Sequence, residues 1–232
     1  MADCALALSM VGDEQAAARV WLAPGDCALA AMPAGAVVLE VSTTTRAWVH
    51  RLAEAAAARG LACADGPVVG SRPQAEAGKL VFLLGGTSEV VARLVPILNP
   101  VAGAVFHVGD VGHGMVLKLM VNALFGIQVA ALAELQPLAA AGLEPAHAQA
   151  LLAKIPVTSE AAAAAGQAMI NRAFAMMFPI DLVGKDFGCV QTTGEALDAA
   201  LPRSAATAAV FQQAIRAGYG GDNITGVARL YS

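Results

Sequence analysis

The spacing of apolar residues changes once along the chain, near Gly109, and this change constrains the fold most. Before it, short apolar segments alternate with alanine-rich helical segments, whereas every apolar segment after it follows helical spacing. Strands that alternate with helices are typical of βαβ units and a largely parallel sheet. We therefore expect an α/β domain over residues 1–109 and an all-α domain over residues 110–232.

The elements expected from this pattern are as follows. Predicted strands cover Cys4–Met10, Ala36–Val41, Leu61–Ala64, Leu80–Leu84 and Val105–Val108. Predicted helices in the first half cover Asp13–Leu22, Arg46–Arg59 and Glu89–Leu98, and Gly60 stands where a left-handed C-cap belongs. Predicted helices in the second half cover Gly114–Ala141, Pro145–Ala153, Thr158–Ala168, Phe178–Thr192 and Ser204–Ala217.

Composition excludes several classes of protein. The sequence is 57% hydrophobic and 14% charged, which argues against a disordered chain. The net charge of −4 argues against a nucleic-acid partner. The four cysteines lie far apart with no CxxC pair, so we expect neither a disulfide framework nor a metal site, and we expect a reducing, cytoplasmic location.

One apolar segment, Met115–Ala133, is close to the length that spans a bilayer. It carries Lys118, Asn122 and Gln128, which a lipid-facing helix would disfavour, so a buried helix fits better and no membrane is expected. The N-terminus has no basic segment typical of a signal peptide. The helix is apolar on nearly every face and must be covered all round, which predicts a homodimer.

The sharpest candidate for chemistry is the pair Lys118 and Asn122. Four residues separate them, so they lie one turn apart on the same face of the predicted helix. Burying an ammonium group among apolar residues is costly unless it has partners or a catalytic task. The alternative is a lysine that reaches solvent beside a surface asparagine.

Three loops or pairs are weaker candidates. The Gly- and Pro-rich loop 65–73 could hold a carboxylate with the N–H groups of Gly70 and Ser71 and with Arg72, or it is an ordinary crossover turn. The hydroxyls of 42–45 follow a strand and suit a helix N-cap. Lys185 and Asp186 are adjacent on a helix, so we expect their side chains to point apart, and a charged solvent face is the alternative.

Other catalytic signatures are absent from the sequence. The four histidines have no partner at ligand spacing and are interpreted as structural. Neither a serine nucleophile elbow nor a Walker A sequence is present.

Taken in order, the motifs resemble those of the β-hydroxyacid dehydrogenase family (3-hydroxyisobutyrate dehydrogenase-like), most nearly its glyoxylate/succinic semialdehyde reductase branch. The resemblance runs from about Ala5 to the C-terminus. Its motifs are Glu40-Val-Ser-Thr43, Asp65-Gly-Pro-Val-Val-Gly-Ser71, Ala75-Glu-Ala-Gly-Lys-Leu80, Gly85-Gly86, Gly109-Asp-Val-Gly-His-Gly114, Lys118-Leu-Met-Val-Asn122 and Gly184-Lys-Asp-Phe187.

The resemblance implies a function and a set of residues. It implies an oxidoreductase that uses NADP or NAD, with NADP favoured, and that acts on a small hydroxy acid or semialdehyde. Lys118 would be the catalytic lysine, which donates or accepts the substrate proton, and Asn122 would position both this lysine and the substrate. The resemblance also places residues around the two ligands: Met10, Val11, Ser42, Thr43 and Lys185 at the cofactor, and Gly70, Ser71 and Arg72 at the substrate carboxylate.

The sequence departs from the family pattern twice. Val69 stands where the family usually has serine, which removes one hydroxyl contact to the substrate. The family begins with a strand, a glycine-rich turn and a helix that hold the pyrophosphate, and no Gly-x-Gly-x-x-Gly occurs near the start of this sequence. We therefore expect a partial Rossmann-like domain that lacks two βα units of about 30 residues each. A non-catalytic dimerisation or scaffold protein, and a fragment of a complete enzyme, are the alternatives.

Overall fold

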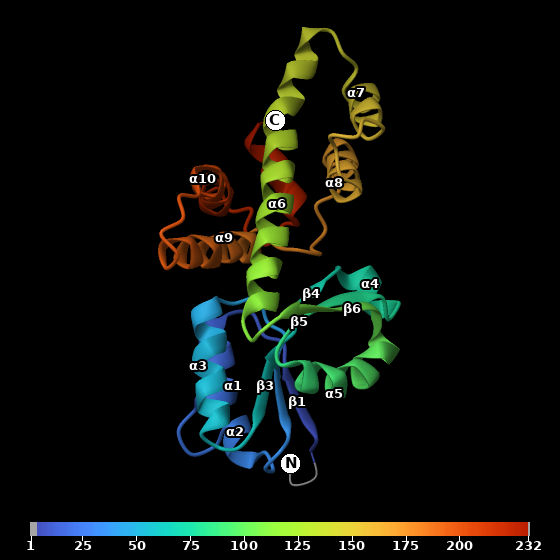
Figure 1. Cartoon of the computed structure of the whole chain (residues 1–232). Helices are drawn as coiled ribbons and strands as arrows, with labels where there is room; N and C mark the ends of the chain where they lie inside the picture. The colour runs from blue at the N-terminus through green and yellow to red at the C-terminus, as the bar shows by residue number, and fades with distance from the viewer. Residues whose placement is uncertain (1–3, 232) are drawn as a thin grey trace. The chain divides into compact units, whose positions relative to one another are not determined.

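A computed structural model describes residues 4–231 of the chain. Two compact units make up the fold, one up to Met120 and one from Val121 onward. Figure 1 shows that the first unit holds the sheet and that helices form the second. The α/β class with a mostly parallel, Rossmann-like sheet and a following helical region is confirmed.

Among the residues that the structure describes, the sheet of the first unit has six strands. Their bounds are β1 (Leu6–Ser9), β2 (Val37–Glu40), β3 (Ala62–Asp65), β4 (Val68–Val69), β5 (Leu80–Gly85) and β6 (Ala102–Gly109). The strand order is β1-β2-β3-β5-β4, and β6 pairs with β5. The pairs β1–β2, β2–β3 and β5–β6 are parallel, whereas β5 runs antiparallel to β3 and β4.

Helices cover both faces of this sheet (Figure 1). On one face lie α1 (Glu14–Leu22), α2 (Ala28–Ala31) and α3 (Arg46–Ala57), and on the other lies α5 (Ser88–Leu98). Successive side chains of β2 point to opposite faces of the sheet, and this creates two cores. Val38 packs with Trp21 and Trp48 on one face. Val37 and Leu39 pack on the other face, the side of α5. Gly60 has a φ of 69°, the left-handed conformation expected of it.

The segment 65–73 is more ordered than the predicted loop. Val68–Val69 forms β4, and α4 (Arg72–Glu76) starts directly after Ser71. Two residues are too few to show a period, and Pro73 fits the first turn of a helix, where a missing N–H is no loss. The tetrapeptide helix α2 was also not predicted.

The second unit consists, among the residues the structure describes, of helices and helical turns. They are the part of α6 (His113–Leu135) beyond Met120, η2 (Gln136–Ala141), α7 (Pro145–Leu152), α8 (Glu160–Ile170), α9 (Ile180–Glu195), α10 (Pro202–Arg216) and η3 (Ile224–Leu230). Phe187 of α9 stacks on Phe211 of α10 in its core, with ring centroids 5.8 Å apart. The predicted helix to Ala141 changes to a 3₁₀ turn after Leu135, because Pro137 has no N–H to continue the α-helical bonding.

By length and composition, His113–Ala141 is the one stretch of the described chain that could cross a membrane. The core helix of a soluble protein has the same length and composition.

Candidate active site

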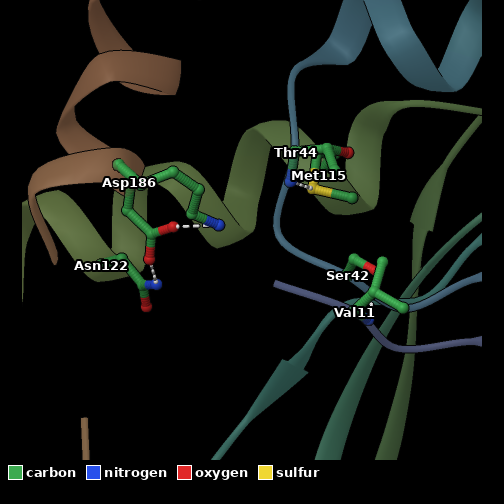
Figure 2. A network of polar contacts seen from close by, with 7 residues as sticks. Val11, Ser42, Thr44, Met115, Asn122 and Asp186 are labelled. Carbon is green, nitrogen blue, oxygen red and sulfur yellow. Dashed lines mark hydrogen bonds and ion pairs between the residues drawn. The ribbon is translucent and has the colours of Figure 1, made fainter. Parts of the chain in front are cut away.

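The candidate cofactor residues of the first unit lie where β1 and β2 end. Met10 and Val11 follow β1, and Ser42 and Thr43 follow β2, which pairs with β1 in parallel. The backbone N–H of Val11 donates to Ser42 Oγ at 2.8 Å, as Figure 2 shows. Ser42 is buried, whereas Met10 is 64% exposed. The carboxyl ends of parallel strands are where open α/β sheets bind their ligands.

The hydroxyl run 42–45 serves two purposes. Thr45 is the N-cap of α3, and its Oγ1 accepts from Trp48 N at 3.1 Å, as the capping interpretation predicts. The backbone N–H of Thr44 points at Met115 Sδ, 3.3 Å away, which joins this segment to the start of α6 (Figure 2). Ser42 and Thr43 come before the N-cap residue Thr45.

Two of the three candidate carboxylate-binding residues, Ser71 and Arg72, already have partners. Ser71 donates to Gln74 Oε1 from both N (2.9 Å) and Oγ (3.0 Å). Arg72 Nε lies 2.8 Å from Glu76 Oε1 in an exposed ion pair. Gly70 is exposed and has a φ of +125°, so a side chain there would be strained. Exposed pairs of this kind contribute about 0–1 kcal/mol, so a carboxylate can replace them at small cost.

Lys118 and Asn122 both lie on α6, one turn apart, as predicted. Each side chain is only 9% exposed, which argues against the alternative of solvent-reaching residues. Asn122 Nδ2 donates to Asp186 Oδ2 at 2.6 Å. The asparagine is therefore held in one orientation by a buried carboxylate.

Asp186 links two candidate residues of the second unit, Asn122 and Lys185. Figure 2 shows its contact with Asn122. It is 4% exposed, and Lys185 Nζ lies 2.8 Å from its other oxygen. The expectation that Lys185 and Asp186 point apart is wrong, because the flexible lysine stem folds back to the neighbouring carboxylate. Sequence reasoning did not assign Asp186 a role; an acidic residue among apolar helical positions was the available signal.

Asp65, the last residue of β3, was also not assigned a role. It is fully buried, and its two oxygens accept from Gly112 N and Met115 N, both at 2.6 Å. Burial raises the pKa of this carboxyl to about 6, although the two N–H donors lower it. Gly114 is required here, since a Cβ would overlap Leu83 O and crowd Asp65 Oδ2.

A second buried carboxylate, Glu40, lies at the end of β2. Its Oε2 accepts from the indole N–H groups of Trp21 (2.9 Å) and Trp48 (3.3 Å), and its Oε1 accepts from Ser42 N at 2.9 Å. Glu40 therefore fixes the backbone at Ser42. Within residues 4–231 no group of three or more His, Cys, Asp or Glu residues could hold a metal ion.

Comparison with known proteins shows the family to which the chain belongs. The model for the NAD-binding domain of NADP-dependent 3-hydroxyisobutyrate dehydrogenase matches residues 112–231, more than half of the chain. The chain belongs to the β-hydroxyacid dehydrogenase family. A second model, for the NAD-binding domain of 6-phosphogluconate dehydrogenase, matches residues 1–109. By this resemblance the chain is an oxidoreductase that uses NAD(P).

Individual relatives agree with the family. A 2-(hydroxymethyl)glutarate dehydrogenase of Eubacterium barkeri is 31% identical over 88% of this chain and 68% of its own length. A 3-hydroxyisobutyrate dehydrogenase of Pseudomonas aeruginosa is 34% identical over 78% of this chain and 64% of its own length. A solved 3-hydroxyisobutyrate dehydrogenase of Salmonella typhimurium is 27% identical with a TM-score of 0.87, over 97% of this chain and 79% of that one. The chain thus spans about two thirds of the length of these curated β-hydroxyacid dehydrogenase relatives.

Proposed function

We propose that the chain catalyses hydride transfer between a nicotinamide cofactor and a small hydroxy acid or its semialdehyde, of the glyoxylate or succinic semialdehyde type. The observation that carries this proposal is Lys118, a nearly buried lysine on α6, one turn from an Asn122 whose amide is held by Asp186.

Lys118 is the proton donor in the proposed reaction. The bound reduced nicotinamide supplies a hydride to the carbonyl carbon of the substrate. As the carbonyl π bond breaks, its oxygen becomes an alkoxide, and Lys118 Nζ gives it a proton. The neutral lysine regains its proton from solvent, and the reverse reaction uses it as a base. Asn122 orients the reacting groups because its own Nδ2 is already fixed on Asp186.

The residues at the ends of β1 and β2 fit a nicotinamide. Met10 is exposed, Gly12 has open space where a Cβ would stand, and Ser42 brings a hydroxyl held by Val11 N. Thr43, next to Ser42, is partly exposed at the same strand end. We assign these backbone and hydroxyl groups to the nicotinamide amide, assign Lys185 of the second unit to the cofactor as well, and propose NADP over NAD.

The connection from β4 to the first residue of α4 is the proposed carboxylate-binding element. The N–H and Oγ of Ser71 would donate to the substrate carboxylate in place of Gln74 Oε1. Arg72 would pair with the substrate carboxylate in place of Glu76. Val69 offers no hydroxyl beside them, which favours a substrate whose carboxylate is satisfied by backbone N–H groups. Substrates shortened or lengthened by one carbon then test the reach of this loop.

We also propose a homodimer in the cytoplasm, with a domain division at residues 109–110. Large apolar side chains of the second unit are exposed in the single chain: Leu124, Leu135, Leu138, Leu143, Leu151, Leu152 and Ile155. Exposed apolar side chains that gather into a patch are typical of a protein–protein interface, and we propose that these do. Native mass spectrometry tests it: a species of twice the chain mass supports the dimer, and a monomer at all concentrations contradicts it.

Calorimetric titration of the 232-residue chain with NADPH and then NADH tests the proposed function. Binding with a micromolar dissociation constant, about −8 kcal/mol, is the expected result. A screen of glyoxylate, succinic semialdehyde and the hydroxy acids named for the relatives then follows the absorbance of the reduced nicotinamide. An absence of binding at millimolar cofactor contradicts the proposal and supports a dimerisation or scaffold role.

A further inference from the structure

Asp65 stands between the two elements on which the proposed chemistry depends. It ends β3 and begins the loop that leads to Gly70 and Ser71. Its carboxylate also accepts from Gly112 N and Met115 N at the start of α6, and Lys118 follows Met115 by one helical turn. One side chain thus joins the strand and loop of the proposed carboxylate site to the helix that carries the proposed proton donor.

The contact is more than a helix cap of the usual kind. Ordinary N-caps come from the residue next to the helix, whereas Asp65 lies 47 residues before Gly112 and 50 before Met115. A carboxylate that accepts two N–H bonds is held in one orientation, and such charge-assisted bonds are about twice as strong as neutral ones. The side chain is fully buried, so water does not compete for these donors.

The backbone around Asp65 is shaped to admit the carboxylate. A Cβ on Gly85 would overlap Asp65 Oδ1, and a Cβ on Gly114 would crowd Asp65 Oδ2. Gly112 has a φ of +90°, a conformation that L side chains rarely adopt, and this turns its N–H toward the carboxylate. Three glycines therefore allow one contact, which a helix needing only a cap would not require.

We propose that Asp65 is a positioning residue of the reaction: its carboxylate fixes the first turn of α6, and with it Lys118, relative to the loop that binds the substrate carboxylate. This inference rests on the proposed function, because it gives Asp65 a task only if Lys118 is the proton donor. It assigns Asp65 no contact with substrate or cofactor.

The contact of the Asp65 carboxylate with the N–H groups of Gly112 and Met115, called the anchor below, also makes the site sensitive to pH. Burial raises the pKa of Asp65 to about 6, so acidification near that value neutralises the carboxylate and weakens both bonds. Several titratable or charged groups lie near Asp65 or near its donor Gly112. His113, at the start of α6, lowers the pKa of Asp65 by its charge. Cys63 on β3 has its own pKa raised to about 12 by burial and by the charge of Asp65. Glu40 is paired in register with Asp65 on β2, and His50 and Arg46 of α3 lie next to Gly112.

The test compares Asp65→Asn with a matched control, Glu144→Gln. Glu144 also accepts from two N–H groups at the start of a helix, those of Ala146 and His147 at 3.0 and 2.5 Å, but its contact is exposed and its helix carries no proposed site residue. Asp65→Asn should lower kcat by about ten- to a hundredfold, while the Kd of the cofactor changes by less than about twofold. Glu144→Gln should change neither by more than about twofold.

A readout other than activity isolates the anchor. In the wild-type protein, the amide N–H signals of Gly112 and Met115 should move with a midpoint near pH 6, and their protection from hydrogen exchange should fall below it. In Asp65→Asn both signals should be independent of pH. If they still titrate in Asp65→Asn, Asp65 is not the group that moves them, and its pH-sensitive contact with α6 is overturned. If the variant does not fold, wild-type signals that stay constant through this range overturn it equally.

The outcomes separate this inference from the proposed function. Full activity of Asp65→Asn together with an inactive Lys118→Ala overturns the role of Asp65 and leaves the function intact. Loss of kcat in Asp65→Asn with full activity in Lys118→Ala contradicts Lys118 as the proton donor. If even the wild-type chain has no turnover, the proposed function fails, and amide signals that do not titrate overturn the anchor as well.

Discussion

Asn122 donates a hydrogen bond from Nδ2 to Oδ2 of Asp186 at 2.6 Å, across 64 residues of sequence. Both side chains are nearly buried, at 9% and 4% exposed. A buried carboxylate that loses its donor is left unsatisfied, and this costs more free energy than the bond itself contributes. The pair therefore matters for stability as well as for the orientation of Asn122.

Asn122→Ala should lower the free energy of unfolding by about 1–3 kcal/mol, because Asp186 Oδ2 then has no donor from α6. Urea denaturation at a fixed protein concentration measures this change. The control is Gln167→Ala, which removes an exposed amide–amide bond to Asn171 at 3.1 Å and should cost less than about 0.5 kcal/mol. Equal losses in the two variants would contradict the special role of the buried pair.

Gly114→Ala should be strongly destabilising, by more than about 3 kcal/mol, because its Cβ would overlap the backbone oxygen of Leu83, which cannot move aside alone. Gly188→Ala is the matched variant, since this glycine lies inside α9 with nothing near its Cβ position. It should raise the unfolding free energy by about 0.5–1 kcal/mol. Thermal melts of both variants give the comparison; a stable Gly114→Ala refutes the close approach.

Asp65 predicts the sign of one part of the pH dependence of stability. Its pKa is raised from 3.8 to about 6, so the folded protein keeps a proton that the unfolded chain has released. The contribution of Asp65 to stability is therefore fully present below about pH 4 and is lost as the pH rises through about 6. The loss is on the order of 3 kcal/mol at most.

The measurement is urea denaturation of the wild-type protein and Asp65→Asn over this pH range. The variant cannot titrate at position 65, so the difference between the two free energies isolates the group. This difference should fall with rising pH between about 4 and about 6 and then level off. A difference that stays constant would mean that Asp65 remains ionised in the folded protein throughout.

Most of the fold could be predicted because the spacing of apolar residues and the positions of Gly and Pro determine the helices and strands locally. The strands of the first half follow from short apolar segments between helices, and Gly60 marks the end of α3 by its positive φ. Pro137 carries the signal that ends α6 at Leu135, although the apolar pattern alone extends the helix to Ala141. β4, with two residues, is too short for any period to reveal.

The site was predictable in its residue types but not in its contacts. Lys118 and Asn122 share a helix face by spacing alone, whereas the N–H donors to Asp65 and the amide donor to Asp186 lie 47 or more residues away. No local pattern encodes such contacts. The pairing of Lys185 with Asp186 was wrongly excluded because adjacent helical positions point apart at Cβ, whereas a lysine stem is long enough to return.

The most direct test of the account is the turnover of Lys118→Ala with reduced nicotinamide and the substrate that the screen identifies. Lys79→Ala, which removes an exposed lysine with no assigned role, is the control. The account predicts that the kcat of Lys118→Ala falls by about a hundredfold to ten-thousandfold, while its Kd for the cofactor is unchanged. Lys79→Ala should keep the wild-type rate. A Lys118→Ala protein that retains most of the wild-type rate would contradict it.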